Sequence, residues 1–505
     1  MALVLCLIPR NYKFLMQIGA LVATFITMAV GLILFSRFDS SAANMDGYRF
    51  VSQIPGLGSQ TLGIACKFGL DGINVGLVLM GSIVAFAAAC CSWEIKTREK
   101  EFYILLLVMT GGILGAFAST DMFFFYFFHE LALVPTFIMI GVWGRGENKN
   151  FATFQITLYL SIGALISLIG LIALYIRSGA GTFDMAALSQ QIKLHPLSSL
   201  QQGHIFPLLL FGFGILISLW PFHSWAPEGY AAAPTPTAML HAGVLKKFGL
   251  YGLIRIAVPF LPNAAEGWAH AIAWLCLGNI IYCGLVAIKQ KNLNWLIGYS
   301  SVAHMGFIFL GIASLNLIGL TGAILVMVAH GLLAALTFGL SGYIYQQAGT
   351  LEMAEMGGLL RRMPFVGAVM IMALFAGCGL PGFANFAGEL TVFFGAWKNG
   401  GLSLVTVIAL WGALVVGAVY MLGAIRSVLH GKLPDRMAAV RESSWPITHL
   451  PYVILLVALI WFGFFPSQLA DKIRPDAQHL LSMAGGNAAM AETRTTPVAV
   501  VAEAK

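Results

Sequence analysis

The sequence predicts an all-α polytopic membrane protein, and three observations support this fold class. Of the 505 residues, 59% are hydrophobic and only 10% are charged, and the mean hydropathy is +0.85, far above that of an ordinary soluble domain. Apolar runs of about 20 residues, each long enough to cross roughly 30 Å of hydrocarbon as a helix, recur along the chain. No segment between these runs is long enough to form a soluble domain.

Polar residues and Pro or Gly punctuation divide the apolar runs into about thirteen expected spans. The apolar stretch ahead of them stops at Ile8 and is too short to span, so we expect either the end of a further helix or a half-inserted segment. After about Asp476 the composition predicts a loosely ordered tail. The expected spans are 14–35, 72–92, 102–118, 122–142, 151–176, 205–222, 236–259, 268–288, 296–314, 317–344, 364–397, 402–425 and 447–465.

Two of the spans contain a predicted break. Pro221 lies near the end of one apolar run in "LISLWPFHSW", and Pro381 lies between glycines inside another in "GCGLPGFANFAGEL". Proline removes a backbone donor and glycine lets the chain leave the helix, so both places should unwind. The breaks are five spans apart, which is typical of inverted-repeat transporters. We therefore expect N-terminal helices (1–101), two inverted five-helix repeats (102–259 and 268–425), a C-terminal loop and helix (426–475) and the tail (476–505).

Lysines and arginines fall mainly in every second loop, which predicts that these loops face the cytoplasm. The same distribution accounts for the net charge of +7 without a nucleic-acid surface. The seven cysteines lie mainly in apolar runs and form no C-x-x-C or Cys/His spacing, which argues against an iron–sulfur cluster or zinc. We predict no bound metal.

Glu130 is the first of several ionisable residues inside expected spans. It lies about eight residues into its span, on the order of 12 Å from the start and therefore near the bilayer midplane. An ionised carboxylate there costs several kcal/mol, so it should face a protein or water-filled interior. The sequence leaves open a permanently protonated, structural Glu130, but favours a proton-exchanging carboxylate.

Five more intramembrane residues extend this pattern. Lys246 and Lys247 lie near the middle of their span, and adjacent helical residues point about 100° apart, so the two lysines cannot share one partner. Glu389 follows the Pro381 break, and His304 and His330 supply imidazoles suited to a proton relay. A single intramembrane histidine is more often a packing residue. A Glu, Lys, His, His, Glu series in successive spans favours a proton path.

Five segments contain these ionisable residues and their surroundings: "STDMFFFYFFHELALVPTFIMIGVWG", "AGVLKKFGLYGLIR", "SSVAHMGF", "VAHGLLAALTF" and "GLPGFANFAGEL". Together they resemble the antiporter-like membrane subunits of respiratory complex I, most closely subunit M of proton-translocating NADH:quinone oxidoreductase. The resemblance covers about residues 70 to 465, and it favours subunit M over L or N because those typically carry Lys in place of Glu389. It implies a fourteen-helix fold, no redox cofactor, proton translocation coupled to quinone reduction elsewhere, L- and N-type neighbours, and a bacterial inner membrane. It also implies the roles of essential carboxylate for Glu130, central lysine for Lys247, distal acid for Glu389 and relay for His304 and His330.

One departure from the family pattern concerns the partner of Glu130. The family usually places a lysine seven residues before the histidine of its P-x-H-x-W motif, and counting back from His223 reaches Leu216. We therefore expect His129, His241 or Lys246 to lie within hydrogen-bond reach of Glu130, directly or through one water. The remaining alternative is a subunit that no longer pumps.

Two other function classes remain open from the residues alone. A subunit of a multisubunit Na⁺/H⁺ antiporter or of a membrane-bound hydrogenase fits the intramembrane charges almost as well. A solute transporter would need more polar residues around Pro221 and Pro381 than the sequence contains.

Overall fold

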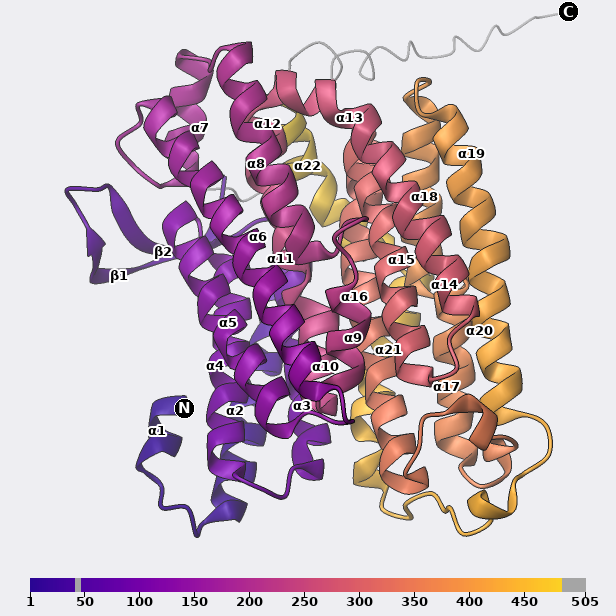
Figure 1. Ribbon diagram of the computed structural model, residues 1–505. Coiled ribbons are helices and arrows are strands. Elements are labelled where there is room, and N and C mark those ends of the chain that lie inside the picture. The colour runs from indigo at the N-terminus through magenta and orange to yellow at the C-terminus, as the bar shows by residue number, and fades with distance from the viewer. Residues whose placement is uncertain (41–46, 484–505) are drawn as a thin grey trace, which may run out of the picture.

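The computed structural model describes residues 1–40 and 47–483, and most of them lie in helices. Figure 1 shows an upright bundle with α5 and α6 towards one flank and α19 and α20 at the other. In the first half of the chain the α-helices are α1 (Ala2–Leu7), α2 (Lys13–Ser36), α3 (Val75–Cys91), α4 (Glu99–Ala118), α5 (Met122–Trp143), α6 (Lys149–Ser178), α7 (Met185–Leu194), α8 (Ser199–Ile217) and α9 (Trp225–Ala232). They continue with α10 (Thr235–Leu240), α11 (Lys247–Gly252), α12 (Val258–Phe260), α13 (Pro262–Leu277), α14 (Gly284–Ile288), α15 (Leu293–Ala313), α16 (Leu317–Ala348), α17 (Pro364–Gly377), α18 (Ala384–Lys398), α19 (Ser403–Trp411), α20 (Ala418–Ala424), α21 (Leu450–Phe464) and α22 (Ser467–Met483).

The number of uninterrupted spans is smaller than expected. Among the described residues, ten helices are long and apolar enough to cross a membrane, or eleven if α21 and α22, bent by 69°, count as one. The expected span 364–397 is divided into α17 and α18, and the expected span 236–259 is divided into shorter pieces. In the latter, π-helical segments η2 (His241–Leu245) and η3 (Leu253–Ala257) alternate with α10, α11 and α12. The division of 364–397 was expected at Pro381, whereas the interruption of 236–259 by π-helical segments was not.

Both predicted helix breaks are confirmed. α8 ends at Ile217 and α9 begins at Trp225, so Pro221 lies in the connection. α17 ends at Gly377 and α18 begins at Ala384, so Pro381 lies in the second connection. The last carbonyl groups of a helix have no partner within the helix. Each break therefore exposes backbone acceptors inside the bundle.

A β-hairpin is an addition to the expected all-α fold. β1 (Arg49–Ser59) pairs antiparallel with β2 (Ile64–Leu70), and Figure 1 shows the hairpin at one flank. The segment lies between two expected spans, where the hydropathy pattern predicted only a connection. The fold class is therefore corrected to a helical membrane bundle with one hairpin outside the spans.

The C-terminal boundary also differs from the expectation. α22 continues through Asp476 to Met483, so the expected tail does not begin at Asp476. The rest of that expected tail, 484–505, lies outside the described residues. At the other end of the chain, the short apolar stretch that stops at Ile8 forms the six-residue helix α1.

α16 is the central helix of the bundle. Its apolar window is fully buried, and it packs against α3, α10, α15, α18 and α21. A helix that is apolar on all sides is stable only when other helices surround it. Because of this central position, polar side chains of α16 can contact residues near both helix breaks.

Candidate functional site

Lys247 and His330 form the first contact of a buried polar line. Lys247, the first residue of α11, is 0% exposed, and its Nζ lies 2.9 Å from Nδ1 of His330 on α16. The same Nζ donates to the carbonyl oxygen of Ala242 at 2.7 Å. The sequence correctly places Lys247 in the interior. A lysine ammonium beside an imidazole nitrogen is a proton donor and acceptor pair.

His304 on α15 continues the line from His330. The two imidazole ring centroids are 5.4 Å apart. Nδ1 of His304 lies 2.7 Å from the carbonyl oxygen of Ser300, and Nε2 lies 3.2 Å from the carbonyl oxygen of Gly377. Carbonyl oxygens only accept hydrogen bonds, so a neutral imidazole can satisfy one of these contacts and an imidazolium both. The backbone geometry around His304 therefore suits a proton-carrying ring.

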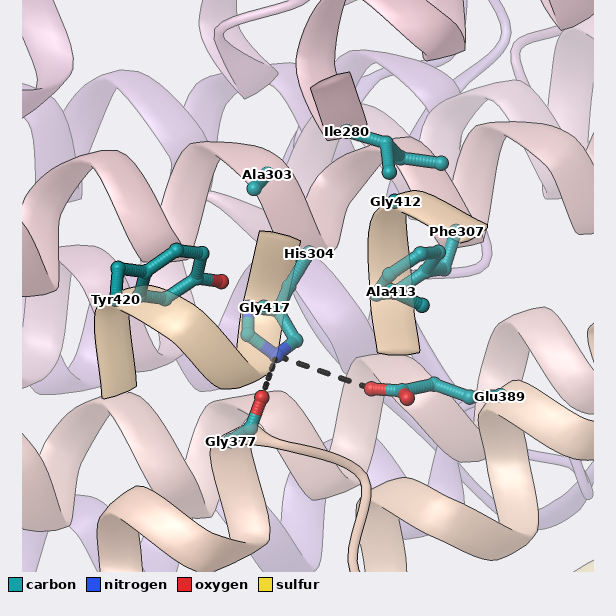
Figure 2. Close-up of a pocket in the computed structure, with 10 residues that line it drawn as sticks. All are labelled: Ile280, Ala303, His304, Phe307, Gly377, Glu389, Gly412, Ala413, Gly417 and Tyr420. Carbon is teal, nitrogen blue, oxygen red and sulfur yellow. Dashed lines mark hydrogen bonds and ion pairs between the residues drawn. The ribbon is translucent and has the colours of Figure 1, made fainter. Parts of the chain in front are cut away.

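The Pro381 break creates part of this geometry. Gly377 is the last residue of α17, and its carbonyl is directed at His304 (Figure 2). Glu389 on α18 approaches from the other side, with Oε1 3.8 Å from His304 Nε2. Gly379 has φ +68°, and a Cβ there would lie 2.8 Å from Glu389 Oε2. Gly379 thus allows both the left-handed backbone conformation of the turn and the close approach of the Glu389 carboxylate.

Two small cavities adjoin the histidines. Each is about the size that one water molecule requires. The first lies beside His304, Glu389 and Tyr420 (Figure 2). The second is lined by His304, His330, Ser300, Ser301 and Thr337, among others. Lys247, His330, His304 and Glu389 therefore follow one another with room for water at the longer gaps.

Glu130 occupies a different environment from the one expected. Its side chain is 34% exposed on α5, although its Oε1 atom is buried. Its Oε1 lies 3.4 Å from Nδ1 of His129, although neither atom has a hydrogen-bond partner within the described residues. Of the three basic residues expected near Glu130, His129 lies at the expected distance. This chain therefore provides only part of the expected interior environment, because hydropathy does not define how a helix is rotated about its axis.

His129 separates Glu130 from Lys247. The His129 ring is 2% exposed and stacks on Phe248 with ring centroids 3.8 Å apart, and Phe248 follows Lys247 in the chain. Among the described residues, no ion pair or hydrogen bond connects Glu130 to Lys247. The structure brings together four of the five residues of the predicted series and leaves Glu130 outside their contacts.

His241 and Lys246, the other two candidate partners, point elsewhere. The His241 ring packs against Trp225 and Tyr230, with centroid separations of 5.6 and 5.3 Å. Lys246 is 1% exposed, and its Nζ lies 5.5 Å from the centre of the Tyr230 ring. Neither residue forms an ion pair with Glu130 in the part of the chain that the structure describes.

A second polar cluster lies near the junction of the hairpin and α3, and it was not among the sequence candidates. Arg255 donates to Asp71 in a buried ion pair, and its Nε donates to the Tyr251 hydroxyl at 3.2 Å. Asp476 of α22 accepts from the Gly72 backbone at 2.6 Å and from Arg49 of β1 at 3.3 Å. Asp71 and Asp476 lie outside the expected spans, and Arg255 lies near the end of its span, so a search for ionisable residues near mid-membrane does not find this cluster.

The interrupted helices and the buried Lys, His, His, Glu line define an antiporter-like membrane subunit. Residues 119–415 match the family described as NADH:quinone oxidoreductase/Mrp antiporter, transmembrane. The chain is 34% identical to F(420)H(2) dehydrogenase subunit M of Methanosarcina mazei, covering 91% of this chain and 92% of that protein. It is 32% identical to NADH-quinone oxidoreductase subunit M of Rhodobacter capsulatus, covering 94% and 91%. The chain therefore belongs to the antiporter-like subunit M family of NADH:quinone oxidoreductase.

Solved structures agree with this membership. A chain of respiratory complex I from Thermus thermophilus superposes with a TM-score of 0.84 at 26% identity, covering 96% of this chain and 100% of that one. A chain of the Mrp complex from Dietzia superposes with a TM-score of 0.78 at 18% identity, covering 94% and 95%. The second likeness shows the shared fold alone. This chain is a multi-pass membrane subunit of the complex I type.

Proposed function

We propose that this subunit translocates protons through the line formed by Lys247, His330, His304 and Glu389. Translocation is coupled to quinone reduction elsewhere in the complex, because the subunit supplies proton-carrying groups and needs no redox cofactor of its own. The observation that carries the proposal is the contact of 2.9 Å between Lys247 Nζ and His330 Nδ1, continued by His304 to Glu389.

The proposed transfer begins at Lys247. Its ammonium N–H bond breaks as an N–H bond forms at His330 Nδ1, and the positive charge moves to the imidazole. From His330 the proton passes to His304 through the cavity that both rings line. From His304 it reaches Glu389 directly or through the cavity in Figure 2. The carbonyls of Ser300 and Gly377 stabilise the intermediate charge on His304.

Glu130 acts at the boundary with a neighbouring subunit. Its partly exposed carboxylate shares the outer face of α5 with exposed Phe127, Leu131 and Val134. A carboxylate on such an apolar face is costly against lipid and is stabilised by a donor from another polypeptide. We propose that a similar antiporter-like subunit, of the L or N type, covers this face, with lipid around the rest of the bundle. His129 then couples Glu130 to the interior.

The proposal also covers the number of membrane crossings, the inverted repeats and the membrane in which the complex lies. The interrupted segments around α10 to α12 and α17 to α18 cross the bilayer with the longer helices and give thirteen crossings. The breaks at Pro221 and Pro381 occupy equivalent places in two inverted repeats. We place the complex in a bacterial inner membrane, with the basic loops in the cytoplasm.

Replacement of Lys247 tests the proposed function. Lys247→Met keeps a long apolar side chain and removes the proton, so proton translocation per electron should fall by about tenfold or more. Lys193→Met, on the exposed side of α7, is the matched control and should retain full translocation. Both variants are measured in the intact complex in sealed vesicles, with Na⁺ present and absent. Normal translocation by an assembled Lys247→Met complex would refute the proposal, and strict Na⁺ dependence would replace the proton by Na⁺.

A further inference from the structure

Two adjacent lysines are buried in the middle of this bundle and have different surroundings. Lys246 and Lys247 are 1% and 0% exposed, and no carboxylate pairs with either among the described residues. Lys247 has two hydrogen-bond partners, whereas Lys246 Nζ has none in the described part of the chain. A buried ammonium without a hydrogen bond is costly. The path from Lys247 to Glu389 does not use Lys246.

Lys246 is directed towards the break between α8 and α9. Its Nζ lies 5.5 Å from the Tyr230 ring centre, and its charge acts on the His223 imidazole in the break and on Cys283 at the end of η4 (Gly278–Cys283). His223 Nδ1, the Tyr230 hydroxyl and His241 Nδ1 are also buried without hydrogen-bond partners in the described residues. Four unpaired polar groups thus surround one interrupted helix. Buried polar groups in proteins are normally paired, so this cluster is exceptional.

The two lysines are electrostatically linked. They follow one another after the π-helical segment η2 and point in different directions, but both are buried, and the charge of Lys246 acts on Lys247, His241, His304 and His330. Two like charges in a low-dielectric interior oppose one another strongly. Protonation of one lysine therefore favours release from the other, and the pair titrates as a unit.

We propose that Lys246 is a positioning residue of the proton path, a second protonatable amine whose charge expels the Lys247 proton towards His330. This inference rests on the proposed function of the Lys247 line. The proton that charges Lys246 arrives from the side of His223 and Tyr230 and leaves by the same side. When Lys246 is charged, a Lys247 N–H bond breaks and an N–H bond forms at His330 Nδ1. Lys247 is left as a neutral amine that accepts the next proton once Lys246 is neutral.

Opposite substitutions at Lys246 distinguish this role from packing. Lys246→Met removes the charge, so Lys247 holds its proton more tightly and the alkaline limit of proton translocation should rise by about one pH unit. Lys246→Arg keeps a permanent charge, so the same limit should fall by about one pH unit. The pH profile is measured on the intact complex in sealed vesicles, with native gels to establish assembly. Lys246→Gln repeats the neutral substitution with a polar side chain.

Each outcome has a defined meaning. Shifts in opposite directions support the proposal. Unchanged profiles, or shifts in the same direction for Met and Arg, overturn it. If Met, Gln and Arg all prevent assembly while Lys247→Met assembles, Lys246 serves packing and the proposal fails. If Lys247→Met translocates normally, the proposed function itself fails, which separates the two hypotheses.

Discussion

At the scale of single residues, backbone carbonyl groups are as important to the polar line as its charged side chains. His304 is held between the carbonyls of Ser300, one turn earlier in α15, and Gly377, at the end of α17. Glu389 approaches through the space left by Gly379. Within a dozen residues, the interrupted helix therefore supplies the Gly377 carbonyl as acceptor, the space at Gly379 and the Glu389 carboxylate. This arrangement gives a helix break in the membrane a specific chemical purpose.

Gly379 offers a direct test of this geometry. Gly379→Ala places a methyl group 2.8 Å from Glu389 Oε2 at a left-handed φ of +68°, so the carboxylate must move and translocation should fall by about tenfold. Gly349→Ala is a matched control, because Gly349 has φ +70° and a Cβ there would meet nothing within 4 Å. Both variants should lose about 1 kcal/mol of stability from the backbone strain. Equal translocation by the two variants would show that the position of Glu389 is not critical.

Glu130 is tested by removing its proton while keeping its shape. In Glu130→Gln the side chain still forms hydrogen bonds but cannot titrate, so translocation should fall by about tenfold or more while the complex still assembles. Glu147→Gln, in the exposed loop after α5, should behave as the wild type. Proton translocation per electron is measured for both. A structural Glu130 would instead tolerate Gln and lose assembly with Ala. His129→Gln then tests whether its neighbour at 3.4 Å transmits the effect.

At the scale of elements, α22 is hydrogen-bonded to the N-terminal hairpin and to the residues just before α3. Asp476 binds the backbone of Gly72 and the guanidinium of Arg49, which is 6% exposed. A Cβ on Gly72 would lie 1.7 Å from the Lys472 carbonyl oxygen, so the backbones of α22 and the start of α3 are in direct contact. Segments more than 400 residues apart in sequence are thereby joined at one end of the bundle.

Loss of the Asp476 carboxylate should release this junction. Asp476→Ala removes the ion-pair partner of Arg49, which keeps only the Ser40 carbonyl, and the acceptor of the Gly72 amide, and it should cost about 2–4 kcal/mol of stability. Asp471→Ala in the same helix removes an exposed i,i+3 pair with Arg474 and should change stability by less than about 0.5 kcal/mol. The stability of both variants is measured by thermal unfolding of the purified complex and by amide hydrogen exchange in α22. Equal stability of the two variants would exclude the junction as a stabilising element.

At the scale of the whole molecule, the bundle exposes apolar surface around the partly exposed carboxylate of Glu130. We expect the Glu130 face to be covered by a neighbouring subunit in the complex and open in the isolated chain. Cysteines introduced at Phe127 and Leu131, 45% and 37% exposed, should react with a lipid-phase reagent in the isolated chain. The same cysteines should be protected in the intact complex. Equal labelling in both states, or active transport by the purified single chain, would contradict the assembly.

The sequence by itself determined the membrane class, most of the spans, both helix breaks and the residues of the polar line. These features depend on local properties: apolar length, the missing proline donor, and the high cost of an ionisable group in hydrocarbon. The same properties placed Lys246 and Lys247 in the interior, which their burial confirms. A span is recognised from its own residues, so no knowledge of its neighbours is needed.

Only the tertiary structure decided which of those residues meet. It turned Lys247 towards His330 and Lys246 towards Tyr230, and left Glu130 partly exposed beside His129. Apolar composition on every side of a helix leaves its rotation undefined, and packing against other helices fixes it. The hairpin and the binding of α22 to Gly72 were also beyond local patterns. The partners in the α22 contact are 404 residues apart in sequence, and hydropathy carries no signal for such a pairing. The strands of the hairpin are neighbours in sequence, but they lie between two expected spans, where hydropathy predicts only a connection.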